Sequence, residues 1–137
     1  MDQKLKHLEL IQGVINRLST NSFLLKGWSV VLVSALFALA APESRTAFVY
    51  LAYIPAVVFW GLDGYFLWQE RLYRALYDHV RSQQDAEIDF SMDTSSFRSG
   101  SAGGWPGAVL SRTLLAFHGV LLISIVVVMV LTLGNKG

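Results

Sequence analysis

Cysteine is absent from this 137-residue chain, and charged residues make up 15% of it. Without cysteine the chain forms no disulfide bond, no thiolate nucleophile and no cysteine-ligated metal centre. The formal net charge is +1, which excludes a nucleic-acid-binding protein that depends on a large excess of basic charge. Soluble globular domains contain about 25% charged residues, so the low charge content also points away from that class.

Hydrophobic residues account for 53% of the sequence, and they cluster in three long runs over residues 23–41, 47–68 and 107–133. A helix needs about 20 mostly apolar residues to cross the hydrocarbon core of a bilayer. We therefore predict an all-α integral membrane protein with three transmembrane helices, organised as a single membrane domain over residues 1–137. Pro55 lies inside the second run and predicts a kink in that helix.

Lysine and arginine are distributed unevenly around the predicted spans. Of the 11 residues, nine lie before or at the start of the first span, between the second and third, or just inside the third; Arg45 and Lys136 are the exceptions. Because basic residues are enriched on the cytoplasmic side, we expect a cytoplasmic N-terminus and long loop and an outward-facing C-terminus. We expect four tryptophans to anchor the spans at the inner interface: Trp28, Trp60, Trp68 and Trp105.

Two segments outside the spans have the apolar periodicity of amphipathic helices. The stripe of residues 3–18 consists of Leu8, Ile11, Ile15 and Leu18. The stripe of residues 69–83 consists of Tyr73, Leu76, Tyr77 and Val80. We expect the two stripes to pack against each other beneath the membrane, within one subunit or between subunits. The alternative is that each helix lies on anionic lipid.

The connections between these helices are also predicted from composition. Residues 19–22, Ser-Thr-Asn-Ser, are expected to interrupt the first helical pattern and cap the next helix. Residues 84–105 are expected to form a cytoplasmic loop, rich in serine and glycine toward its end. Within it, residues 88–92 alternate apolar and polar side chains in a strand-like way.

Asp63 is the one acidic residue inside the predicted spans. A carboxylate is costly in hydrocarbon and normally faces a partner or water. At 1.5 Å per residue, Asp63, Arg112 and Lys26 each lie about 5–8 Å inside the inner end of a span. We expect a polar layer in which Asp63 pairs with Arg112 or Lys26; the alternative is that the two cations extend to the headgroups. Gly61 and Gly64 flank the acid and offer room for close helix packing.

His118 lies about 16 Å into the third predicted span, near the middle of the bilayer. We favour a neutral histidine that is hydrogen-bonded to a neighbouring helix; the alternatives are a proton relay and a pore-lining group. His7 and His79 lie on polar helices, where we expect them to be solvated. The sequence has no phosphate-binding loop, zinc-protease motif or nucleophile elbow, so we predict no enzyme activity, no cofactor and no metal site.

The first 93 residues contain a distinctive combination of short motifs. They are KHLELIQGVINR at 6–17, NSF at 21–23, KGW at 26–28, FWGLDGY at 59–65, QER at 69–71 and YD at 77–78. Together these motifs resemble the RipA family of octameric bacterial membrane proteins. The resemblance implies a bacterial cytoplasmic-membrane protein that assembles as a ring of eight, with a role in stress adaptation or defence. It supplies no catalytic residues.

Three functions are compatible with this sequence. We favour a ring-forming homo-oligomer that acts as a pore or membrane-perturbing effector, in which neighbouring copies shield an acid that three helices alone shield poorly. The second function is a non-conducting scaffold or regulator that binds lipids, partner proteins or a cytoplasmic ligand. The third is a small proton-coupled transporter. We expect membrane lipids and further copies of the chain as partners, and no nucleic acid.

Overall fold

The computed structural model describes residues 2–40, 47–98 and 103–134, and every regular element within them is helical. In chain order the elements are α1 (Asp2–Ala40), α2 (Ala47–Leu51), α3 (Tyr53–Ser82), the 3-10 turns η2 (Asp85–Glu87) and η3 (Ser95–Phe97), α4 (Trp105–Val109) and α5 (Arg112–Gly134). Three stretches are long and apolar enough to cross a membrane: α1, α2 together with α3, and α5. The predicted all-α fold with three candidate spans is confirmed.

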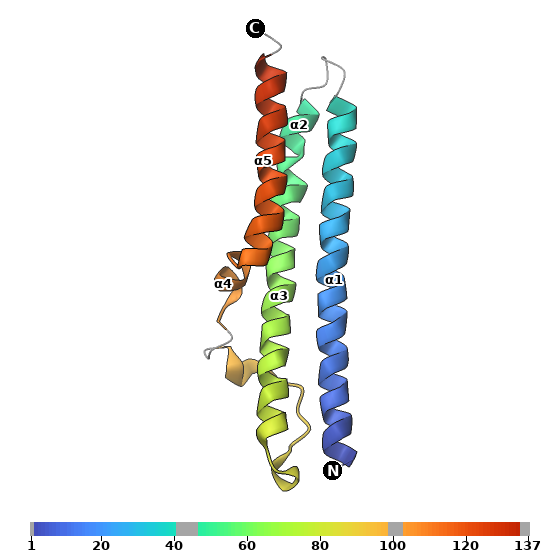
Figure 1. The fold of residues 1–137 in the computed structure, drawn as a ribbon, viewed down its shortest axis with the longest axis vertical. Helices are drawn as coiled ribbons and strands as arrows, with labels where there is room; N and C mark the ends of the chain where they lie inside the picture. Colours follow the sequence, from blue (N-terminus) through green and yellow to red (C-terminus); the bar gives the residue numbers. More distant parts are fainter. Residues whose placement is uncertain (1, 41–46, 99–102, 135–137) are drawn as a thin grey trace.

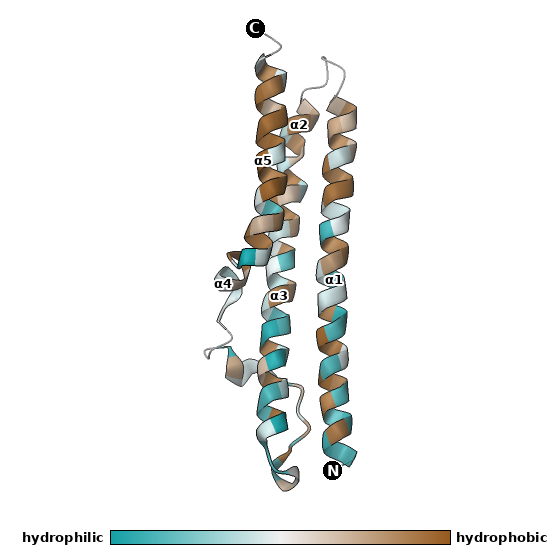
Figure 2. Cartoon of the chain, viewed as in Figure 1, coloured by the Kyte–Doolittle hydropathy of each residue, from teal (hydrophilic) through white to brown (hydrophobic). Residues whose placement is uncertain are grey.

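The long helices lie side by side along the long axis of the molecule, with the chain termini at opposite ends (Figure 1). α1 packs mainly against α3, and α5 packs beside α2 and the adjoining half of α3. Hydrophobic residues dominate the half that contains the C-terminus, whereas polar residues are frequent in the other half of α1 and α3 (Figure 2). We call this second half, residues 2–20 and 69–98, the polar end.

The first helix continues through its predicted boundary. All four residues at 19–22 are helical and belong to α1, so the predicted interruption is wrong. Serine, threonine and asparagine each lower helix propensity by less than about 1 kcal/mol, and packing against α3 outweighs a deficit of that size. The 39 residues of α1 span about 58 Å at 1.5 Å per residue, so the helix is much longer than the roughly 30 Å of a hydrocarbon core.

Ala52 interrupts the second predicted span and separates α2 from α3. Pro55 has no N–H, so the carbonyl of Leu51, four residues earlier, loses its helical partner. The amide nitrogen of Ala52 lies 3.2 Å from the carbonyl oxygens of both Phe48 and Val49, an arrangement that is common where a helix tightens. The helix is therefore interrupted at Ala52, within the region 52–55 where the kink is predicted.

The third predicted span, residues 107–133, is divided. α4 carries Pro106 in its first turn, and a two-residue turn ending at Ser111 separates α4 from α5. Ser111 starts the new helix: its carbonyl accepts the N–H of Leu115 at 2.8 Å, and its hydroxyl accepts the N–H of Leu114 at 3.4 Å. One uninterrupted helix from residue 107 is therefore a wrong prediction, and the candidate span is α5 alone.

Two separate hydrophobic cores hold the helices together. The core of the polar end joins both predicted stripes to the segment after α3, and its members are Leu8, Ile11, Ile15, Tyr73, Leu76, Tyr77, Val80, Ile88, Met92 and Phe97. The other core lies among α1, α2, α3 and α5 and is centred on Val33, Ala52, Ala56 and Ile125. The two stripes thus pack against each other, and the half-buried Leu18 is not a member of their core.

The segment after α3 folds back over the polar end without forming a strand in its described part, residues 83–98. The strand-like interpretation of residues 88–92 is wrong, because an isolated strand needs a neighbour to satisfy its backbone. Ile88 instead enters the core, while Phe90 has a positive φ of 59°. The rest of the predicted loop includes residues 99–102, which lie outside the described residues, as does the connection at 41–46.

Gly64 allows α4 to approach α3 closely. A Cβ atom at this position would lie 3.2 Å from the Cα of Val109 and closer still to its side chain. At Gly61, one turn earlier, a Cβ would lie 3.7 Å from an indole carbon of Trp105, which is an ordinary contact. Close packing therefore requires glycine at Gly64 but not at Gly61.

We predict that Gly64→Ala lowers the free energy of unfolding by about 1–3 kcal/mol, because overpacking displaces α4 from α3. Gly61→Ala is the matched control and should be neutral or stabilising by up to about 1 kcal/mol, since alanine is the better helix former. Unfolding in detergent micelles, followed by far-ultraviolet circular dichroism, measures both changes. Equal losses in the two variants would contradict the close contact.

Candidate functional site

The side chain of Asp63, on α3, is fully buried and connects all three long helices. Lys26 of α1 places Nζ 2.7 Å from Asp63 Oδ2, and His118 of α5 places Nε2 2.8 Å from the same oxygen. Ser22, one helical turn before Lys26, donates its hydroxyl to Oδ1 of Asp63. We call Ser22, Lys26, Asp63 and His118 the Asp63 cluster.

The Asp63 cluster meets the conditions for burying a charge. Both carboxylate oxygens accept hydrogen bonds, and one of them faces an ammonium group. Lys26 Nζ also donates to Ser22 Oγ at 2.9 Å and lies 5.9 Å from the centroid of the Phe117 ring. The side chain of Lys26 is 19% exposed, whereas that of His118 is 1% exposed. The cluster is therefore closed around His118 and reaches the protein surface through Lys26.

Asp63 also fixes the tautomer of His118. An ionised carboxylate accepts hydrogen bonds and donates none, so Nε2 carries the hydrogen that points to Asp63. Nδ1 has no hydrogen-bond partner among the described residues. Trp60 stacks on the imidazole with 5.9 Å between ring centroids and 7° between planes, and Phe117 meets it edge-on at 5.0 Å and 83°. The ring is thus held in one orientation, hydrogen-bonded to a neighbouring helix.

The predicted difference in depth between His118 and Asp63 is wrong. α5 begins at Arg112 rather than at residue 107, so His118 lies six residues, or about 9 Å, from the start of its helix. This shorter distance brings the imidazole to the level of the carboxylate. The sequence signal for the later start is Ser111, a residue type that favours the position before a helix.

Of the two cations predicted as alternative partners of Asp63, Lys26 forms the pair and Arg112 does not. Its side chain is exposed, and it forms no ion pair within residues 2–40, 47–98 and 103–134. Six residues at 100° each leave Arg112 and His118 about 120° apart around α5, so a helix that turns His118 toward Asp63 directs Arg112 to another face. The ion pair within the predicted layer is therefore that of Asp63 and Lys26, and the shared depth of Asp63, Lys26 and Arg112 in a membrane stays a prediction.

A single chain is sufficient to shield the acid. Asp63 is 0% exposed and His118 is 1% exposed within one copy. The expectation that three helices shield this carboxylate poorly is therefore wrong, because Trp60 and Phe117 close the space beside His118. Self-association, where it occurs, needs a different physical reason.

Three of the four predicted anchor tryptophans hold α4 and the residues before it against α3. Trp60 Nε1 donates to a carbonyl at the end of α4 at 2.9 Å, and Trp105 Nε1 donates to the Gly61 carbonyl at 3.0 Å. Trp68 Nε1 donates to the backbone just before α4 at 3.2 Å. Trp28 is 59% exposed. The stacking of Trp60 on His118 has no separate signal in the sequence. The location of the four tryptophans at a membrane interface stays a prediction.

The polar end departs from expectation at one histidine. His7 is 2% exposed rather than solvated, while His79 is exposed.

In the segment after α3, hydrogen bonds from the backbone N–H and hydroxyl of Ser95 lower the pKa of the exposed Asp93. Among the described residues, no three histidine, aspartate or glutamate side chains gather closely enough to hold a metal ion.

Comparisons of this chain with protein-family models, with curated proteins and with solved structures found no match. The function of the Asp63 cluster is therefore inferred from its own geometry. The octameric ring that the resemblance implies stays a prediction.

We predict that Lys26→Met lowers the free energy of unfolding by about 3–5 kcal/mol, because it leaves a buried carboxylate without its cation. Asp63→Asn should also destabilise the protein. The double variant should lose less than the sum of the two, with a coupling of about 0.5–3 kcal/mol. Reversible unfolding in bicelles measures the cycle.

Arg112→Gln provides the control for this cycle. It removes an exposed cation from the same part of the molecule and should change stability by less than about 0.5 kcal/mol. Strictly additive losses for Lys26 and Asp63, or an Arg112 effect as large as theirs, would contradict the ion pair.

Proposed function

We propose that this chain is a multi-pass protein of the bacterial cytoplasmic membrane that assembles with copies of itself into a non-conducting scaffold or regulator. In this role it binds lipids and presents its polar end to a partner in the cytoplasm. The supporting observation is that the polar side chains of the Asp63 cluster bond to one another, with only partial exposure of Lys26.

The outward face of α5 supports a non-conducting assembly. It is formed by large apolar side chains, namely Val120, Ile123, Val127, Val130 and Leu131. The two hydroxyls toward the end of this helix, Ser124 and Thr132, donate to carbonyls of their own helix at 2.9 and 2.7 Å. Hydroxyls that are hydrogen-bonded within their own helix are tolerated in hydrocarbon. This face of α5 therefore has few free polar groups that could hydrogen-bond water in a passage.

Two observations support contact with lipid or with further copies. Most of each candidate span is not buried within one chain. A groove of about 600 Å³ also lies between α1 and α5, lined by Val30, Phe117, Val120 and Ser124 among others. An acyl chain or an apolar helix fits such a surface. Assembly into a ring of eight enters this proposal from the resemblance alone.

The pore-forming effector is the second candidate, and the surface of α1 is what favours it. Ser34 is exposed, and Lys26 retains some exposure. If α1 faced the axis of a ring, these side chains would border the passage. The proton-coupled transporter is weaker, because the buried carboxylate of Asp63 already accepts hydrogen bonds from Ser22, Lys26 and His118.

We predict no leak of potassium or of a small dye when the purified chain is reconstituted in liposomes, together with an oligomer in native mass spectrometry. Protein-free liposomes give the baseline, and gramicidin gives the positive response. A leak that stops when Ser34→Cys is modified with a bulky thiol reagent would replace the scaffold with a pore. A single copy throughout would contradict assembly.

The excess of basic residues predicts that the polar end is cytoplasmic. Because the natural chain has no cysteine, a single introduced cysteine is a unique label. With an impermeant maleimide, Gly134→Cys should react in intact spheroplasts, and Gln84→Cys should react after permeabilisation. The unaltered chain is the blank, and the reverse labelling pattern would contradict this orientation.

A further inference from the structure

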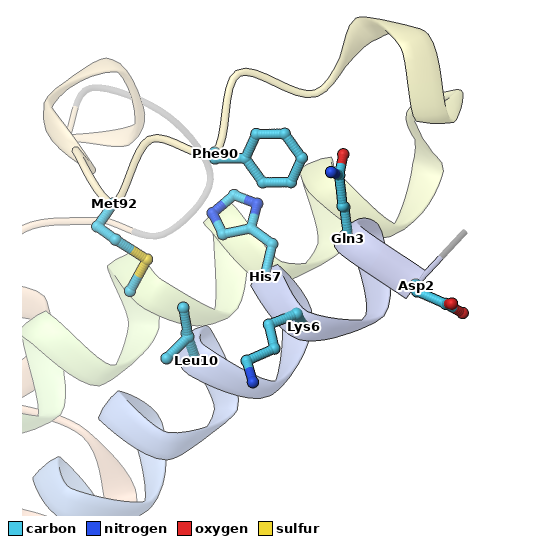
Figure 3. Close-up of a pocket in the computed structure, with 7 residues that line it drawn as sticks. All are labelled: Asp2, Gln3, Lys6, His7, Leu10, Phe90 and Met92. Atoms are coloured by element: carbon cyan, nitrogen blue, oxygen red, sulfur yellow. The ribbon is translucent and has the colours of Figure 1, made fainter.

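A pocket of about 530 Å³ opens at the polar end, between the first turns of α1 and the segment after η2 (Figure 3). This volume lies within the range of sites for small molecules. Leu10, Phe90 and Met92 supply apolar walls, and the polar groups come from Asp2, Gln3, Lys6 and His7. A mostly apolar pocket with a few polar groups is the usual composition of a ligand site.

His7 provides a buried hydrogen-bond acceptor at this pocket. Its Nε2 lies 3.1 Å from the carbonyl oxygen of Ser91, and since a carbonyl accepts, Nε2 carries the hydrogen. Nδ1 of the neutral ring is then an acceptor; it is buried and has no partner among the described residues. Figure 3 shows Nδ1 on the side of the ring that faces Phe90 and Gln3. A buried acceptor without a partner needs an explanation, and a ligand with a donor supplies one.

Phe90 provides a flat wall at an energetic cost to the backbone. Its φ of 59° lies in the left-handed region, which is unfavourable for a bulky residue. The ring is 46% exposed, and its centroid lies 5.4 Å from that of His7 with 55° between planes. Strained residues of this kind cluster at ligand clamps and switch regions. An exposed, strained aromatic beside an unpartnered acceptor favours a ligand that presents both a flat face and a donor.

We propose that this pocket binds a small, uncharged, planar heteroaromatic molecule that carries a ring N–H. The N–H donates to Nδ1 of His7, the flat face lies against Phe90, and Met92 and Leu10 contact its apolar edge. The molecule is uncharged because the two charged residues of the lining, Asp2 and Lys6, both extend away from the two facing rings (Figure 3). The lining residues all belong to one chain, so this site goes beyond the proposed function and does not depend on assembly.

Benzimidazole and 1-methylbenzimidazole test the proposal, because they differ in the ring N–H that the site requires. Titration calorimetry uses the full chain in lipid nanodiscs, with empty nanodiscs as the blank for partitioning. We expect saturable binding of benzimidazole at one site per chain. We expect the methylated compound to bind at least about tenfold more weakly, because it leaves the buried acceptor unpaired.

Three variants identify the site. His7→Phe keeps an aromatic ring but removes the acceptor, so the preference for benzimidazole should disappear. His79→Phe is the matched control at an exposed histidine of the same polar end and should retain the preference. Phe90→Gly removes the wall at a backbone conformation that glycine adopts readily; it should weaken binding of both compounds without lowering the unfolding temperature.

Absence of saturable binding, equal affinity for the two compounds, or an unchanged preference in His7→Phe would overturn the proposal. If circular dichroism shows that His7→Phe is misfolded, Phe90→Gly decides instead, and an unchanged affinity in that variant overturns the site. Selective binding by a chain that native mass spectrometry finds as a single copy would leave this site intact while contradicting the proposed assembly.

Discussion

A carboxylate in the interior of an apolar helix bundle needs a cation and hydrogen-bond donors beside it. The arrangement of the three long helices depends on that constraint. Asp63 receives hydrogen bonds from α1 and α5, which fixes the rotation of both helices relative to α3. The same requirement explains why Ser22 and Lys26, one turn apart, share one face of α1. A change in the register of either flanking helix would leave a charge without its partner.

One chain buries and neutralises the carboxylate of Asp63 without a second copy. The stability of a single chain therefore does not require assembly. The protomer has its own electrostatic centre and its own two hydrophobic cores. Its outer surface is not needed to close the charge. In the proposed assembly, contacts between such units would depend on shape and apolar contact.

Much of the architecture follows from hydropathy and periodicity. The presence of three candidate spans, the interruption of the second near Pro55 and the packing of the two apolar stripes all depend on local patterns that survive in the folded chain. The contact between Lys26 and Asp63 was also predictable from the sequence, because depth along a helix follows from residue count. Hydropathy and periodicity describe one helix at a time and carry no information about its neighbours.

Features set by contacts between elements were not predictable in this way. The continuity of α1 through residues 19–22 depends on the support of α3, and a propensity argument counts only the local cost. The interruption at Ser111 places His118 at the level of Asp63. A helix predicted to start at residue 107 therefore does not predict the hydrogen bond between His118 and Asp63. The burial of His7 depends on the segment around Phe90, which is 83 residues away in the sequence.

The unbroken course of α1 has a mechanical consequence. Nineteen residues separate His7 from Lys26, a distance of about 28 Å along a helix that has no hinge between them. Because α1 is continuous over this length, an axial rotation or shift of its first turns would also displace the ammonium group of Lys26 relative to the carboxylate of Asp63.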